Sequence, residues 1–273
     1  MPSRLASYLE ALQVALEQHP LVRAAWVEGS LGRGNADRYS DVDLHVLVSE
    51  ADLPAFKAEA EGWLNRVCPL VLFNLLFGGH MINALTQDGI RLDVWPHAGQ
   101  TERLDPSKAR VIYEVPGSST QDLSTPTPDQ AVLGRQALAQ TREFWRCITL
   151  LPAVVGRGEH LVAFSGLAVE LNLVAELLMV GLGMVRDRGV KNLNDYLPPE
   201  AREWLEKTVT LADLSPQALI DAHLGLARIV QEEGPRIAER YGYPYPRALE
   251  TTAVRHVWEE LGALGYHTQA LKA

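Results

Sequence analysis

The sequence predicts an α+β protein in two parts: a small mixed β-sheet domain over residues 1–122, followed by an all-α helical bundle over residues 123–273. Short apolar runs bounded by Gly and Pro alternate with amphipathic segments up to about residue 95, which is typical of strands and helices in one domain. Residues 116–129 are rich in Pro, Ser and Thr and are interpreted as a linker, and only helical periodicity follows them.

The first domain is expected to begin with a helix over residues 3–18, because apolar residues recur there at helical spacing up to Pro20. A second helix is expected after Ser49. The dipeptide Asp88-Gly89 is a hairpin signal. Apolar runs predict strands over 22–28, 42–48, 70–76, 80–86 and 90–95. The hairpin signal makes the last two antiparallel neighbours.

The most apolar stretch, residues 69–85, is short and interrupted by Asn and Gly, so it indicates buried strands rather than a membrane span. In the second half, helices are expected over about 129–150, 159–185, 199–210, 215–241 and 246–264. Glu170 and Glu176 interrupt an apolar helix there. A charge in an apolar face is costly unless it is paired or functional, so both remain candidates.

Composition limits the partners that we expect. The 273 residues suggest about two domains. With 25 basic and 34 acidic residues the net charge is −9, which disfavours general nucleic-acid binding and suits cationic partners. Cys68 and Cys147 lie far apart in the sequence, and the N-terminus shows no signal-peptide core. We therefore expect a cytoplasmic protein without a membrane partner.

The most informative stretch is WVEGSLGRGNADRYSDVDL, residues 26–44. Asp41 and Asp43 are two apart at the start of a predicted strand, so their side chains share a face while Val42 and Leu44 enter the core. Adjacent carboxylates repel each other unless a cation lies between them. Two carboxylates with open positions suit Mg²⁺.

Asp93 is a third acidic residue in a predicted strand, flanked by Leu92 and Val94. If its strand neighbours that of Asp41 and Asp43, three carboxylates form a cluster for two metal ions. Such a pair clamps both the attacking and the leaving oxygen of a phosphoryl displacement.

Gly29 and Ser30 precede this pair at a predicted strand-to-helix turn. Free N–H groups at a helix start bind anions, and the Ser30 hydroxyl adds a donor suited to a triphosphate. Arg33 is close enough in sequence to add a cation. The motifs GxxxxGK[ST], GxSxG and HExxH are absent from the sequence, so P-loop, nucleophile-elbow and zincin chemistries lack support.

The pattern of Gly29-Ser30, then Asp41-Val42-Asp43, then a strand-borne Asp93 resembles the nucleotidyltransferase superfamily that includes DNA polymerase beta. By position, the resemblance implies that Asp41 and Asp43 are metal ligands. It implies that Asp93 is a third ligand that helps to activate the acceptor hydroxyl, and that the Gly-Ser turn binds phosphate. The helical half resembles the small antibiotic nucleotidyltransferases that modify aminoglycosides or lincosamides.

The resemblance implies a catalytic domain over 1–122 and a helical substrate-binding domain over 123–273. It also implies transfer of a nucleoside monophosphate, expected as AMP from ATP, to a hydroxyl, with release of pyrophosphate. Two Mg²⁺ ions and a nucleoside triphosphate are the expected cofactor and co-substrate. A homodimer is compatible with this resemblance.

Glu143 and Arg146 lie three apart on the first helix after the linker, so they share a face. An ion pair between them is the simplest interpretation. Their rough position in the resemblance implies instead that Glu143 is a general base and that Arg146 binds the triphosphate. His45 shares a strand face with Asp41 and Asp43, where a packed histidine is the simpler interpretation than a metal ligand.

The acceptor expected first is an aminoglycoside antibiotic, because an acidic site attracts a polycation, and the expected role is then antibiotic resistance. Two alternatives stay open. One is an enzyme that adenylylates a protein, as an antitoxin-like or regulatory partner. The other is a non-catalytic nucleotide-binding module, which the intact set of three carboxylates disfavours.

Overall fold

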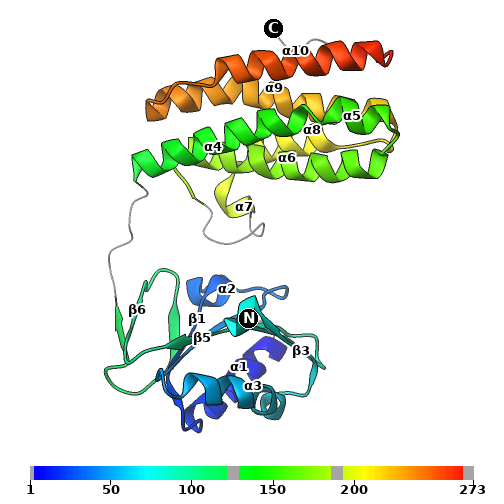
Figure 1. Ribbon diagram of the computed structural model, residues 1–273. Coiled ribbons are helices and arrows are strands. Elements are labelled where there is room, and N and C mark those ends of the chain that lie inside the picture. Colours follow the sequence, from blue (N-terminus) through cyan, green and yellow to red (C-terminus); the bar gives the residue numbers. More distant parts are fainter. Residues whose placement is uncertain (1–2, 122–128, 186–192, 267–273) are drawn as a thin grey trace. The chain divides into compact units, whose positions relative to one another are not determined.

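The computed structural model describes residues 3–121, 129–185 and 193–266. It divides into two compact units, Met1–Pro126 and Thr127–Ala273, and each unit is described by itself (Figure 1). The predicted boundary between residues 122 and 123 lies outside the described residues.

The first unit is built on a six-stranded sheet in the order β3-β4-β5-β2-β1-β7. Strands β2 and β5 are parallel, and the other neighbouring pairs are antiparallel. The predicted mixed sheet is therefore confirmed. The elements are α1 (Ser3–Glu17), β1 (Val22–Val27), α2 (Gly29–Arg33), β2 (Val42–Val48), α3 (Leu53–Val67), β3 (Leu70–Leu76), the 3-10 turn η1 (Phe77–Gly79), β4 (Met81–Thr86), β5 (Arg91–Ala98), β6 (Glu102–Leu104), β7 (Arg110–Glu114) and β8 (Ser119–Gln121).

One face of this sheet is covered by α1 and α3 (Figure 1). Val42, Leu44 and Val46 of β2 are fully buried in the same cluster as Leu12 of α1 and Phe56 of α3. Each such side chain contributes about 1.5–3 kcal/mol by leaving water. Because side chains alternate along a strand, this packing turns the intervening residues of β2 to the opposite face. The site is built on that opposite face.

Three short strands were not predicted. Strand β7 adds an edge next to β1, and β6 pairs with β8 in a separate two-stranded ribbon. The prediction of a linker over 116–129 was wrong for residues 119–121, which form β8. Such strands are too short to show a clear alternating pattern, so pairing with a distant partner decides their conformation.

Strand β3 corrects a second prediction, because it is not buried. It forms an edge of the sheet, where Val71 is 63% exposed and Leu75 is 52% exposed. Apolar composition alone therefore does not distinguish an edge strand from a central one. The predicted antiparallel pairing of β4 with β5 around Asp88-Gly89 is confirmed.

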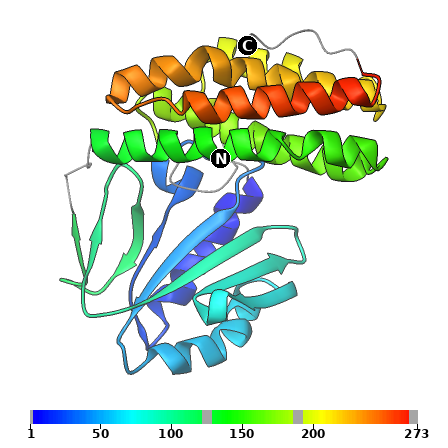
Figure 2. The same ribbon diagram turned by 45° about the horizontal axis from the view of Figure 1, so that its top comes forward.

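The second unit is helical. Its long helices α4, α6, α9 and α10 run with their axes nearly aligned (Figures 1 and 2). The five predicted helices are confirmed, and short α5 and α7 are additional. The elements are α4 (Gln130–Ile148), α5 (Leu151–Gly156), α6 (His160–Gly181), α7 (Leu193–Tyr196), α8 (Pro199–Val209), α9 (Pro216–Tyr241) and α10 (Arg247–Ala263). The core includes Phe144, Trp145, Leu177 and Ile229.

Within the described residues, α6 is the one helix long and apolar enough to cross a membrane, by length and composition. The core helix of a soluble protein passes the same test. Leu167, Val174 and Leu177 of α6 are buried in the core of the helical unit. The absence of a membrane partner stays a prediction.

Candidate active site

The parallel pairing of β2 with β5 brings two predicted site residues side by side. Asp43 of β2 is the register partner of Asp93 of β5, and both side chains are partly exposed. Asn83 of β4 is the register partner of Asp93 on the other side, and its amide Nδ2 donates a hydrogen bond of 2.7 Å to Asp93 Oδ1. Asp93 therefore has a fixed orientation on the open face of the sheet.

Gly29 brings the start of α2 against Asp43. Its φ is +63°, in the left-handed region that favours glycine, and a Cβ at this position would lie 2.2 Å from Asp43 Oδ2. The Glu28 N–H also donates a 3.0 Å hydrogen bond to the Asp43 carbonyl. A side chain at residue 29 would collide with the carboxylate, so the glycine is what lets Asp43 approach the turn this closely.

Ser30 is held next to the loop that leads to Asp41. Its Oγ donates a 2.9 Å hydrogen bond to Ser40 Oγ, which in turn donates to Asp37 Oδ1 at 3.1 Å. Arg33 ends the short helix and is exposed. The expected Gly-Ser turn is therefore present.

Asp41 directly precedes β2, and its carboxylate pairs with Arg91 at 3.9 Å. Among the described residues, no three His, Cys, Asp or Glu side chains are grouped so that they could hold a metal ion as they stand. Asp41 and Asp93 instead take Arg91 and Asn83 as partners. The donor chemistry still fits Mg²⁺, since carboxylate oxygens are the hard ligands that this ion prefers.

A pocket of about 250 Å³ lies on the same sheet face and is lined by Trp26, Glu28, His45 and His97 among others. His45 Nδ1 lies 2.8 Å from His97 Nε2, and the His45 ring stacks with the rings of Trp26 and His97. Burial, together with the neighbouring His97, lowers the pKa of His45 to about 3. Burial also lowers the pKa of His97, so this imidazole pair is neutral at pH 7.

Sequence reasoning missed four neighbours of the site: Asn83, Arg91, Glu28 and His97. Asn83 could have been found, because a hairpin centred on Asp88 places residue 83 opposite residue 93. Glu28 and His97 become neighbours of His45 only through the pairing of β1 and β5 with β2. That pairing is not visible in the sequence.

Glu143 and Arg146 belong to the second unit, where they pair with each other. Arg146 Nη2 lies 2.6 Å from Glu143 Oε1 and its Nε lies 2.8 Å from Oε2, so the contact is bidentate. Both side chains are exposed, and the hydrogen bonds from Arg146 lower the pKa of Glu143. This is the i,i+3 ion pair that was the simplest interpretation.

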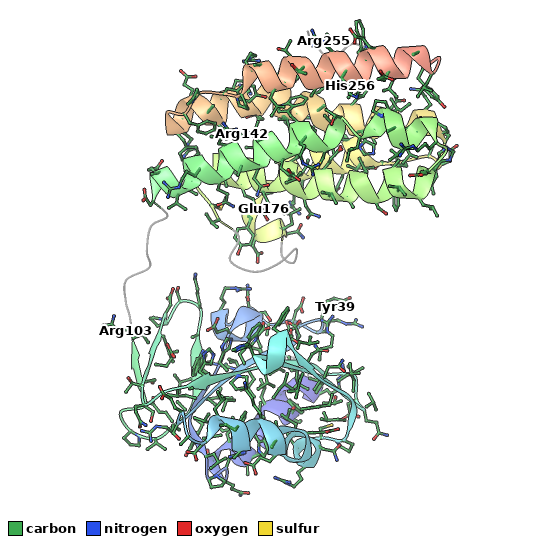
Figure 3. All side chains as sticks on the ribbon, viewed as in Figure 1. Tyr39, Arg103, Arg142, Glu176, Arg255 and His256 are labelled. Atoms are coloured by element: carbon green, nitrogen blue, oxygen red, sulfur yellow. The ribbon has the colours of Figure 1, made fainter. Side chains whose placement is uncertain are left out.

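Glu170 and Glu176 of α6 differ in their surroundings. Glu170 is buried against His223 of α9, whose Nδ1 lies 2.7 Å from Glu170 Oε2. Glu176 is partly exposed and lies on the side of α6 where α7 is found (Figure 3). The buried charge is therefore paired.

A mixed sheet with helices on one face thus carries two register-paired aspartates on the other face, with a Gly-Ser turn beside Asp43. Residues 9–112 match the family model described as "Nucleotidyltransferase domain". This match confirms both the superfamily resemblance and the enzyme class predicted from the sequence. A search of curated proteins found no match.

Solved structures similar to this chain include three bacterial proteins. An aminoglycoside 6-adenyltransferase from Bacillus subtilis is 15% identical, with 95% of this chain and 99% of that chain covered and a TM-score of 0.43. A nucleotidyltransferase-like protein from Exiguobacterium sibiricum is 14% identical, with 94% and 89% covered and a TM-score of 0.40. A CdnE cyclic dinucleotide synthase from Elizabethkingia meningoseptica is 16% identical, with 96% and 91% covered and a TM-score of 0.30. TM-scores under 0.5 mark a distant likeness, too weak to assign a substrate.

Proposed function

We propose that this chain transfers a nucleoside monophosphate, in the first instance AMP from ATP, to a hydroxyl of a small molecule and releases pyrophosphate. One observation carries the proposal: Asp43 and Asp93 are register partners, and Gly29 lets the Asp43 carboxylate lie directly against the Gly-Ser turn. Carboxylates placed beside a phosphate-binding turn suit a reaction in which charge develops on phosphoryl oxygens.

Asp41, Asp43 and Asp93 are the residues that would hold two Mg²⁺ ions, with Asp93 completing one of the two sites. When bound, the ions neutralise charge on the α-phosphoryl group and on the departing pyrophosphate. The chain does the rest. The turn at Gly29 and Ser30, with Arg33, binds the β- and γ-phosphates, and Asn83 keeps Asp93 oriented toward the acceptor.

Asp93 is the general base that we favour for the acceptor hydroxyl. It carries a hydrogen bond from the neutral Asn83 amide on one oxygen. Glu143 is the second candidate, but its bidentate partner Arg146 lowers its pKa and makes it the weaker base. Roles for Glu143 and Arg146 on substrate require that their ion pair open.

The acceptor that we propose is an aminoglycoside, which would make the enzyme a cytoplasmic agent of antibiotic resistance. The pocket beside the aspartates combines the rings of Trp26 and His45 with the carboxylate of Glu28. A carboxylate in the lining suits a sugar that carries amines. The net charge of −9 favours the approach of such a polycation.

Pyrophosphate release tests this function. The full chain is incubated with Mg²⁺ and each nucleoside triphosphate in turn, across a panel of aminoglycosides and lincosamides. Acceptor-dependent release with a product heavier by one nucleoside monophosphate supports the proposal. Nucleotide binding without release supports a non-catalytic module, and labelling of lysate proteins alone supports protein adenylylation.

A further inference from the structure

Three arginines gather in one pocket of the first unit, on the Asp41 side of the candidate site. Arg4, Arg38 and Arg91 line a cavity of about 330 Å³ together with Tyr39 and Ser40. The first 126 residues hold only 10 basic residues against 16 acidic ones, so three guanidinium groups at one pocket are a local reversal of charge.

The elements of the pocket are far apart in the sequence. Arg4 comes from the first turn of α1, Arg38 from the loop between α2 and β2, and Arg91 from the start of β5. Figure 3 shows Tyr39 on that loop at the outer edge of the first unit. The fold therefore collects cations that no sequence motif groups together.

The loop that carries Arg38 is held in place. Arg91 Nη2 donates a 2.9 Å hydrogen bond to the Tyr39 carbonyl, and the Tyr39 N–H donates to Asp37 Oδ1 at 2.8 Å. The Arg38 guanidinium lies 5.0 Å from the centre of the Tyr39 ring. Two of the three cations therefore have defined neighbours before any ligand arrives.

The pocket is connected to the candidate site at two points. Ser40 lines the pocket, and its Oγ accepts the hydrogen bond from Ser30 of the Gly-Ser turn. Arg91 lines the pocket and pairs with Asp41 at 3.9 Å. An anion in the pocket would therefore lie beside both the phosphate-binding turn and a proposed metal ligand.

We propose that the pocket of Arg4, Arg38 and Arg91 is an oligophosphate site that holds a pyrophosphate-like anion next to Asp41. The three guanidinium groups carry three positive charges. A ligand with one carboxylate would neutralise only one of them, whereas an oligophosphate carries several negative charges. Their planar guanidinium groups and the Tyr39 hydroxyl can donate to phosphoryl oxygens. The volume is larger than one orthophosphate group needs.

This assignment rests on the proposed function for its natural source, because that reaction releases pyrophosphate. The anion is either the terminal phosphate end of a nucleotide that the Gly-Ser turn also contacts, or an oligophosphate carried by a second molecule. Both sources present the same chemistry to the arginines, and competition with nucleotide distinguishes them.

Calorimetric titration of the full chain with inorganic pyrophosphate in EDTA tests the site without any metal ion. We expect wild-type protein to bind pyrophosphate more tightly than orthophosphate. We expect the double variant Arg4→Gln with Arg38→Gln to bind pyrophosphate about tenfold more weakly, as expected for two exposed charge-assisted contacts. Arg66→Gln, on α3 behind the sheet, removes one positive charge away from the pocket and should leave the affinity unchanged. Equal affinity in the double variant and wild type overturns the proposal.

Two further measurements, competition with nucleotide and titration of the Asp43→Asn variant, distinguish the source of the anion and separate the anion site from the transfer activity. If the nucleotide is the source, nucleoside triphosphate displaces pyrophosphate whereas monophosphate does not, and if a second molecule is the source, both ligands bind together. Asp43→Asn should keep pyrophosphate affinity in EDTA even where turnover is lost. Failure of the transfer assay alone therefore counts against the proposed function and not against the anion site.

Discussion

His223 Nδ1 lies 2.7 Å from Glu170 Oε2 inside the helical unit, and each side chain is 3% exposed. His223 Nε2 lies 3.1 Å from the Ala163 carbonyl, which only accepts, so Nε2 carries a proton. One further proton is shared between Nδ1 and Glu170. The pair is neutral as a whole, which explains how a carboxylate is tolerated in an apolar helix.

This pairing predicts unequal effects of removing either partner. His223→Leu leaves Glu170 buried without its partner and should cost about 3–5 kcal/mol of the unfolding free energy. Glu170→Gln keeps a hydrogen-bonding group opposite Nδ1 and should cost about 1 kcal/mol. Urea unfolding followed by far-ultraviolet circular dichroism measures both. Equal losses of unfolding free energy in the two variants would mean that side-chain packing, and not the shared proton, determines the contribution of this pair to stability.

Asp43→Asn tests the proposed chemistry, because it removes a charge and preserves volume. Transfer should fall by at least about a thousandfold, as expected when a group that stabilises phosphoryl charge is lost. The melting temperature should stay near that of wild type. Initial rates of pyrophosphate release measure the effect, with Asp88→Asn in the exposed hairpin turn as the matched control. Retained turnover in Asp43→Asn would count against the metal assignment.

Gly29→Ala tests the close approach of the Asp43 carboxylate to the Gly-Ser turn. The new Cβ would meet Asp43 Oδ2 at 2.2 Å and a φ of +63°, so both sterics and backbone strain act against it. We expect a loss of transfer and destabilisation by more than about 2 kcal/mol. Gly34→Ala has a similar φ of +76° with open space around it and should cost only about 1 kcal/mol. Similar behaviour of the two variants would refute the steric argument.

His19 predicts a pH dependence of stability in the first unit. Burial against Phe56 and Trp63 lowers its pKa below the ordinary 6.5, despite Glu59 at 3.4 Å. The folded state therefore favours neutral His19, so its contribution is complete above pH 6.5 and is lost as pH falls through the lowered pKa.

Urea unfolding between pH 8 and pH 5 checks this dependence. His19→Asn keeps an acceptor for the Leu21 N–H and should flatten the decline at low pH. The exposed His80→Gln should leave the profile unchanged. An equally steep decline in His19→Asn would assign the effect to other groups, such as the His45–His97 pair.

Much of the candidate site could be read from local pattern. The spacing of Asp41 and Asp43 in an apolar strand fixes their common face, and the hairpin signal at Asp88-Gly89 pairs β4 with β5. The partners of these residues could not be read in this way. Arg4, Arg38 and Arg91 share one pocket although they are up to 87 residues apart in the sequence.

By itself the sequence determined which segments are helices or strands where they are long and periodic, and it marked the Gly-Ser turn and the three aspartates. Only the tertiary structure decided that β2 lies parallel to β5, that β3 is an exposed edge and that β8 replaces part of a linker. The physical reason is the separation in sequence over which each kind of interaction acts. Periodicity and turn geometry act between residues close in the chain, whereas strand order and ion-pair partners depend on contacts between residues far apart in it.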